Sequence, residues 1–151
     1  MFFCVKYNCR FTIDGEVKEK LGELFWAGCC DDKATVETIA KYFGEYGYLV
    51  DTHTAVALDV YNQYLKETGD DRTVVVASTA SPYKFVRSVL EAVSDKAVDN
   101  EFENAKILSE VTNTEIPEQI KALETAEVRF NELREKDEML ASVYANLGIE
   151  N

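Results

Sequence analysis

The spacing of apolar residues along the chain predicts a series of amphipathic helices. Apolar side chains recur every three or four residues in several segments, which is typical of helices with one buried face. Asp31 or Asp32 is the predicted cap of the second of these helices, and Gly69 is the predicted end of the third. The helices are expected at about residues 16–26 and 33–45, after a short extended piece within residues 47–69, from Pro82 to Val93, at about 100–111 and 137–147, and from Pro117.

Two segments have the composition of extended chain. Residues 1–13 alternate, so that every second side chain from Phe3 to Ile13 shares one face. Residues 73–78 contain the unbroken run Val74–Ala77, which is typical of a strand covered on both faces in a parallel sheet. The sequence therefore predicts an α/β fold with one central strand, at about residues 73–78, followed by a helix. Its sheet neighbours are expected either in residues 1–13 or in protein outside this sequence.

Length and charge restrict the classes of function. The chain has 151 residues, and we expect a single domain over 1–151. Its formal net charge is −12, from 16 basic and 28 acidic side chains, which disfavours binding to nucleic acid or to an anionic membrane surface. No apolar run is as long as a membrane span, and the first residues lack the pattern of a signal peptide. These features predict a cytoplasmic protein.

The four cysteines are candidate metal ligands or free thiols. They are Cys4, Cys9, Cys29 and Cys30, and His53 is the one imidazole of the sequence. A C-x4-C pair with a vicinal pair matches known zinc-ligand spacings poorly. A cytoplasmic chain also keeps its thiols reduced. We therefore predict no metal site and interpret the cysteines as buried or half-buried free thiols.

The segment ASTASPYKF, residues 77–85, places hydroxyl groups where the predicted strand meets a helix. Ser81 can cap that helix, and Pro82 suits its first position. In open α/β sheets, ligands bind where strands end and helices begin. The small side chains would let a flat ring approach the backbone, and Ser78 or Thr79 could donate to a ring nitrogen without carrying charge. A capped turn with no ligand explains the same pattern, and both interpretations stay open at this level.

The stretch DTHTAVALDVYNQYLKETGDDRTVVVASTASPYKF resembles the carboxyl-terminal part of threonine synthase, a pyridoxal-phosphate (PLP) enzyme of the tryptophan-synthase-like fold type II. A D-P-H-T-A-V-like motif of that family matches Asp51–Val56, with Thr52 in place of the usual proline. An S/G-T-A-x-P-x-K-F motif is complete at Ser78–Phe85. The segments FWAGCCDD, IPEQIKALETAEVRF and EKDEM extend the likeness over the chain from about Phe11, and residues 1–10 are unmatched.

The resemblance implies a fold, a cofactor and a reaction. The fold would be a helix-rich fragment of a three-layer fold-type II domain. Thr79, with Ser78 as the adjacent candidate, would hydrogen-bond the pyridine nitrogen of PLP. The family is a lyase of threonine biosynthesis, which converts O-phosphohomoserine and water to threonine and phosphate. His53 and Lys84 would lie close to the ligand; their alternative roles are a capping or packing histidine and a solvated or ion-paired lysine.

Other parts of the family's site lie in an amino-terminal portion that this sequence does not contain. They are the Schiff-base lysine, an asparagine motif over the ring and the Gly-rich loop for the cofactor phosphate. We therefore expect this chain alone to be inactive, with no catalytic residue of its own, and not to bind PLP by itself. Two alternatives are a non-catalytic binding or interaction domain, and a half-enzyme completed by a separate amino-terminal chain. An exposed strand at 73–78 would also favour a homo-oligomer.

Overall fold

The computed structural model describes residues 13–129 and 131–149. The chain divides into two compact units, one that ends at Pro117 and one that begins at Glu118. The extended segment predicted at residues 1–13 lies, except for Ile13, outside the described residues. The expectation of a single domain over 1–151 stays a prediction.

The larger unit contains the helices that the apolar spacing predicts. Asp31 caps α2 by accepting the backbone N–H of Ala34 at 2.8 Å, and Gly69 ends α3 in the left-handed conformation, with a φ of 67°. Ser81 caps the short 3-10 helix η1, and Pro82 is its first residue. These caps confirm the predicted starts and ends. The elements are α1 (Gly15–Leu24), α2 (Asp32–Tyr46), α3 (Thr52–Thr68), η1 (Pro82–Phe85), α4 (Val86–Val93) and α5 (Glu101–Thr112).

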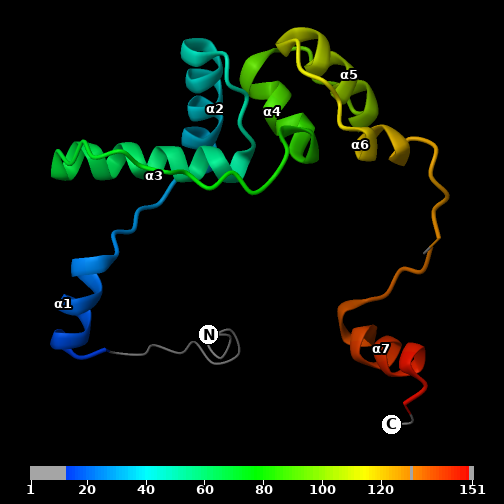
Figure 1. Cartoon of the computed structure of the whole chain (residues 1–151). Coiled ribbons are helices and arrows are strands. Elements are labelled where there is room, and N and C mark those ends of the chain that lie inside the picture. Colours follow the sequence, from blue (N-terminus) through cyan, green and yellow to red (C-terminus); the bar gives the residue numbers. More distant parts are fainter. Residues whose placement is uncertain (1–12, 130, 150–151) are drawn as a thin grey trace. The chain divides into compact units, whose positions relative to one another are not determined.

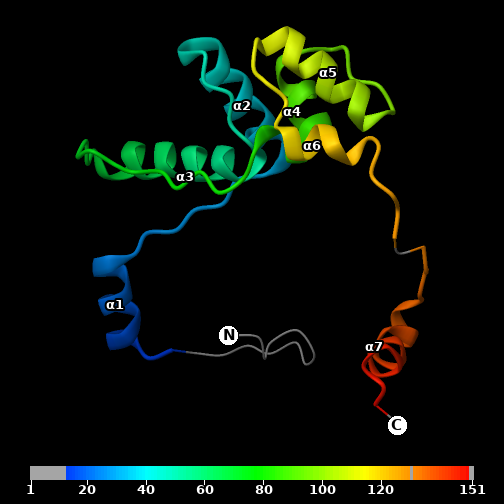
Figure 2. The same cartoon turned by 45° about the vertical axis from the view of Figure 1, so that its right-hand side comes forward.

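Four of these helices form the core of the larger unit. Helix α2 packs against both α3 and α4, and α4 packs against α5, as Figure 1 and Figure 2 both show. Each helix contributes side chains that are fully removed from solvent. They are Ile39 of α2, Ala55 of α3, Val89 and Leu90 of α4, and Leu108 of α5. Burial of this apolar surface is the main favourable term that holds the four helices together.

The prediction of a central strand at 73–78 is wrong, and with it the α/β fold class. The described residues contain helices and no strand, and residues 69–79 form an irregular connection between α3 and η1. A strand exists only where a second segment completes its hydrogen-bond ladder, and no described segment does so here. Val74 is 45% exposed and Val75 is 92% exposed, so the valine run is not covered on both faces.

The predicted buried face of α1 is also wrong. Its apolar residues Val17, Leu21 and Leu24 are 44%, 46% and 80% exposed, and Phe25 just beyond the helix is 69% exposed. In α3 the buried side chains are Thr54 and Ala55, whereas the apolar side chain of Val56 in the same helix is 37% exposed. Apolar spacing identifies which side of a helix is suited to burial, but it does not supply the neighbour that buries it.

The described part of the smaller unit, residues 118–129 and 131–149, contains three short elements. They are α6 (Glu118–Leu123), the 3-10 helix η2 (Lys136–Glu138) and α7 (Met139–Leu147). Their positions confirm the helices predicted from Pro117 and over about 137–147. The described helices, in either unit, include none with the length and apolar character that crossing a membrane requires.

We expect Leu90→Ala to destabilise the larger unit strongly, because Leu90 is fully buried where α4 meets its neighbours. Loss of its side chain removes apolar burial and leaves a cavity, which should lower the free energy of unfolding by about 2–5 kcal/mol. Urea denaturation followed by far-ultraviolet circular dichroism measures this. Val75→Ala is the matched control on an exposed side chain and should change the same free energy by less than about 0.5 kcal/mol. Equal effects of the two substitutions would contradict the assigned core.

Candidate functional site

The start of α3 is organised around the carboxylate of Asp51, which is completely buried. This carboxylate accepts the backbone N–H of His53 at 2.9 Å and that of Thr54 at 3.4 Å, and it also accepts the hydroxyl of Thr54. Asp51 is thus the N-cap of the helix. Thr52 occupies the first helical position, where a proline is well tolerated but not required. The departure from the usual proline therefore leaves the helix start intact.

Burial and hydrogen bonding act on the ionisation of Asp51 in opposite directions. Burial raises the pKa of the carboxyl group, whereas the hydroxyl of Thr54 and the backbone N–H groups of His53 and Thr54 lower it. The hydrogen bonds prevail, and the pKa of Asp51 lies below its ordinary value. At neutral pH this side chain is therefore a carboxylate, which accepts hydrogen bonds and donates none.

Thr54 connects this buried carboxylate to the predicted hydroxyl pair. Its hydroxyl oxygen lies 3.1 Å from that of Ser78, within hydrogen-bond distance, although 24 residues separate the two in sequence. Thr79, the next residue, is exposed. Its hydroxyl has no hydrogen-bond partner among residues 13–129 and 131–149. The two candidate hydroxyls thus differ: the protein engages the hydroxyl of Ser78, and the described structure leaves that of Thr79 free.

The other end of the motif is held by a buried tyrosine. Tyr83 is 5% exposed. Its hydroxyl donates to the carbonyl oxygen of Thr114, just after α5, at 3.1 Å. The hydroxyl oxygens of Tyr83 and Thr114 are 2.7 Å apart. The hydroxyl of Ser81 accepts the backbone N–H of Tyr83 at 3.2 Å. Sequence reasoning missed Tyr83, because it occupies a variable position of the motif and its partner lies 31 residues away.

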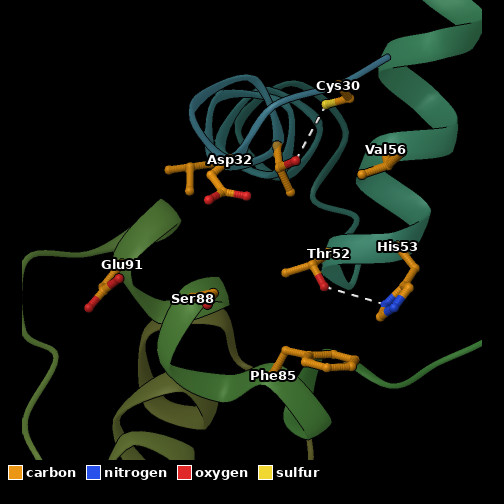
Figure 3. A pocket seen from close by; sticks show the side chains of 10 residues that line it. Cys30, Asp32, Thr52, His53, Val56, Phe85, Ser88 and Glu91 are labelled. Atoms are coloured by element: carbon orange, nitrogen blue, oxygen red, sulfur yellow. Dashed lines mark hydrogen bonds between the residues drawn. The ribbon is translucent and has the colours of Figure 1, made fainter. Parts of the chain in front are cut away.

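A cavity of about 470 Å³ lies beside this motif, where α2, α3 and α4 begin. Figure 3 shows Asp32, Thr52, His53, Phe85, Ser88 and Glu91 around the space. The ring centroids of His53 and Phe85 are 4.9 Å apart, and Nδ1 of His53 is 3.3 Å from Oδ1 of Asp51. The remaining lining residues are Cys30, Thr35, Val36 and Val56.

The structure brings only some of the sequence-predicted site residues together. His53 lines the cavity, whereas Ser78, Thr79 and Lys84 are not among its lining residues. Lys84 is exposed, and its Nζ lies 5.6 Å from the centroid of the Phe85 ring. Phe85 is therefore the side chain that contacts both the lysine and the histidine. Sequence reasoning placed Phe85 in the motif and on the apolar face of the following helix, but not in contact with His53 or Lys84.

The described cysteines have different environments. Cys29 is exposed and Cys30 is half-buried, with its Sγ 3.4 Å from Oγ1 of Thr35. Burial raises the pKa of the Cys30 thiol, against a smaller opposing effect of Thr35. No group of three or more histidine, cysteine or acidic side chains in the described part of the chain is arranged to hold a metal ion. Cys4 and Cys9 lie outside the described residues.

Comparison with known proteins gives this arrangement a family. A family model described as "Threonine synthase, C-terminal" matches residues 54–143. The chain belongs to the threonine synthase C-terminal family. The match includes Ser78, Thr79 and Lys84, and it begins just after Asp51 and His53. The resemblance predicted from the two motifs is confirmed at the level of the family.

Individual relatives match over the same length of chain. Threonine synthase of Schizosaccharomyces pombe is 33% identical over 90 residues, which are 59% of this chain and 18% of the relative. Threonine synthase-like 1 of Homo sapiens is 30% identical over 90 residues, which are 60% of this chain and 12% of the relative. The region shared with the threonine synthase C-terminal family is therefore a small part of each relative's length.

We expect acid to remove the stabilisation that Asp51 provides. Because the pKa of Asp51 is lower in the folded protein, its contribution is fully present above the unfolded value of about 3.9 and disappears as the pH falls through the folded value. Asp51→Asn keeps a good N-cap but removes the charge. It should lower the free energy of unfolding by about 1–3 kcal/mol at pH 7.

Urea denaturation of both proteins between pH 7 and pH 2 measures this difference, which should be constant near neutrality and shrink below about pH 4. Asp71→Asn changes an exposed carboxylate outside the helices and is the control, with an expected change below about 0.5 kcal/mol. A difference between wild type and Asp51→Asn that grows in acid would contradict the assigned hydrogen bonds.

Proposed function

We propose that this chain contributes the pyridine-nitrogen side of a PLP site in an enzyme of the threonine synthase type. The observation that carries the proposal is the hydroxyl of Thr79. It is exposed, it has no hydrogen-bond partner among the described residues, and it lies in a complete family motif held at both ends by the protein. Membership of the threonine synthase C-terminal family supports the choice of cofactor.

The side chains around Thr79 suit a neutral aromatic nitrogen. Ser78, Ala80 and Ser81 are small and uncharged, so a flat ring can approach the backbone closely. A hydroxyl donates to an unprotonated ring nitrogen, whereas a carboxylate would favour the protonated ring. Bound PLP supplies the electron sink for elimination and replacement at the β and γ carbons of the substrate. In this chain, Thr79 would orient the ring and keep its nitrogen neutral.

The proposed reaction is the conversion of O-phosphohomoserine and water to threonine and phosphate, in the cytoplasm. We propose that this chain does not perform it unaided. In the resemblance, no residue of this sequence matches the family's cofactor-binding lysine. The matched region also spans only 12% to 18% of the length of the relatives described above. One side of a site cannot orient both cofactor and substrate for reaction. His53 and Lys84 remain candidates for contact with the ligand.

A second candidate is a half-enzyme that assembles with a separately encoded amino-terminal chain. The exposure of Val75 at 92%, Leu24 at 80% and Phe25 at 69% favours it, because apolar side chains of this size are commonly covered by another protein surface. Copurification of the tagged chain with one defined larger protein would support this candidate. Self-association of the chain is the competing explanation, and sedimentation over a range of concentrations distinguishes the two.

The role of Thr79 can be tested in a chimera. The segment of this chain that aligns with the S. pombe threonine synthase would replace the matching 90 residues of that enzyme. We expect the chimera to release phosphate from O-phosphohomoserine. Thr79→Val should weaken PLP affinity about 2- to 12-fold, the value of one hydrogen bond, because valine has nearly the same shape and no hydroxyl.

Thr79→Ser keeps the hydroxyl and is the matched control, with an affinity close to that of the unmodified chimera. Absorbance titration of the cofactor measures the affinity, and phosphate release measures turnover. A valine variant that binds PLP as tightly as the serine variant would contradict the role given to Thr79. A folded, PLP-bound chimera that releases no phosphate would contradict the proposed reaction.

The chain by itself should not form a specific covalent adduct with PLP. After incubation with PLP and reduction with borohydride, we expect low and scattered modification of exposed lysines, because no lysine is assigned the cofactor-binding role. Peptide mass spectrometry measures the distribution. Stoichiometric modification of one lysine, for example Lys84, would show that the chain builds a cofactor site from its own residues.

A further inference from the structure

The imidazole of His53 lies between a buried carboxylate and an open cavity. Its Nδ1 is 3.3 Å from Oδ1 of Asp51, and its side chain is 62% exposed and lines the cavity of about 470 Å³. We propose that this cavity binds a small organic ammonium ion, with the unprotonated Nε2 of His53 as one acceptor and Asp51 as the residue that positions the imidazole. Such a site requires neither PLP nor the reaction proposed above.

The charge beside Nδ1 determines the tautomer of His53. A neutral imidazole has one N–H and one nitrogen with a free lone pair, and the group beside each nitrogen decides which one carries the hydrogen. Asp51 is ionised at neutral pH, since its pKa lies below the ordinary value. A lone pair on Nδ1 would therefore face a negative charge at 3.3 Å. The hydrogen is favoured on Nδ1, and Nε2 keeps its lone pair.

The hydroxyl of Thr52 is the other polar group close to Nδ1. Its oxygen lies 3.4 Å from that nitrogen, and it can either donate to the nitrogen or accept from it. Donation from Thr52 would require the opposite tautomer and would leave the lone pair of Nδ1 beside the Asp51 carboxylate. Because a charged oxygen is the stronger acceptor and attracts the N–H, we expect Thr52 to accept rather than to donate.

The aromatic ring of Phe85 packs against the imidazole beside the cavity, as Figure 3 shows. The two ring centroids are 4.9 Å apart, and the ring planes are inclined by 50°. The backbone N–H of His53 also donates to Asp51 at 2.9 Å, which ties the same residue to the start of α3. Nε2 has no hydrogen-bond partner in the described part of the chain, so its lone pair is available to a ligand.

The other charged groups of the cavity favour a positive ligand. They are the carboxylates of Asp32 and Glu91, and no lysine or arginine is among the described residues that line the space. Glu91 accepts Nε of Arg87 at 3.2 Å, whereas the carboxylate of Asp32 has no partner among the residues that the structure describes. A phosphate or carboxylate ligand would meet like charge here. An ammonium ion can donate to Nε2 and to a carboxylate, and it can contact the face of Phe85.

The tautomer can be measured on the full chain, because His53 is the one histidine of the sequence. In the ¹⁵N-labelled chain, the nitrogen chemical shifts distinguish a protonated ring nitrogen from an unprotonated one. They are recorded at the alkaline limit, where they no longer change with pH. We expect the hydrogen on Nδ1 in the wild type and in Thr52→Val. Asp51→Asn removes the charge and should move the equilibrium towards hydrogen on Nε2, whereas the control Asp71→Asn should not.

Ligand binding is followed through the same imidazole signals. Ethylammonium chloride is the probe, at the same pH, where it is still ionised, and sodium chloride keeps the ionic strength constant. We expect a saturable change in the Nε2 shift with ethylammonium and none with sodium acetate. Asp32→Asn should weaken ethylammonium binding about 2- to 5-fold, the value of one exposed ion pair, and Asp71→Asn should leave it unchanged.

Hydrogen on Nε2 in the wild-type chain would overturn the proposal, because a protonated Nε2 cannot accept from an ammonium ion. An Nε2 shift that ethylammonium does not change, or that acetate changes equally, would also overturn it. An equilibrium that a folded Asp51→Asn leaves unchanged would contradict the positioning role of Asp51. The wild-type measurements decide the matter even if that variant fails to fold. Failure of the chimera to bind PLP or to release phosphate changes none of these outcomes, so the two proposals fail separately.

Discussion

The buried carboxylate of Asp51 both caps helix α3 and, through Thr54, holds the connection that carries Ser78. Its side chain is fully buried, and its charge is stabilised by two backbone N–H groups and one hydroxyl. These bonds begin α3 and, through Thr54, hold the connection that carries Ser78. Breaking such a site leaves a buried charge without its hydrogen bonds, which is costly. The position of the hydroxyl motif therefore depends on the start of a helix earlier in the chain.

The core of the larger unit makes that dependence possible. Helix α2 contacts both α3 and α4 and so connects the two helices on either side of the motif. The cavity beside the motif lies where these helices begin. Tyr83 links the same motif to Thr114, two residues after the end of α5. The motif is thus fixed by contacts with segments far away in sequence, which is the usual way in which a loop acquires a defined shape.

Much of the candidate site was predictable from residue type and spacing. Ser81 and Pro82 indicate a helix start by local chemistry alone, and Asp51 precedes a helical pattern in the same way. What spacing could not distinguish was Ser78 from Thr79, since adjacent hydroxyls have the same local pattern. The difference arises from Thr54, which is 24 residues away. Likewise, Phe85 belongs to a recognisable motif, but its contact with His53 depends on the tertiary structure that brings η1 close to the start of α3.

The sequence by itself determined the helices, their caps and the family, because these follow from local chemistry and from residue order. It could not determine which apolar segments are covered. Val74–Ala77 has the composition of a buried strand, and α1 has the spacing of a buried face, yet the described chain supplies neither with a partner. Tertiary structure decided these cases, because a strand needs a second strand for its backbone hydrogen bonds and an apolar face needs a neighbouring surface. The strand or helix propensity of a segment limits the structures that it can form, and contacts with distant segments determine which of these structures the folded protein contains.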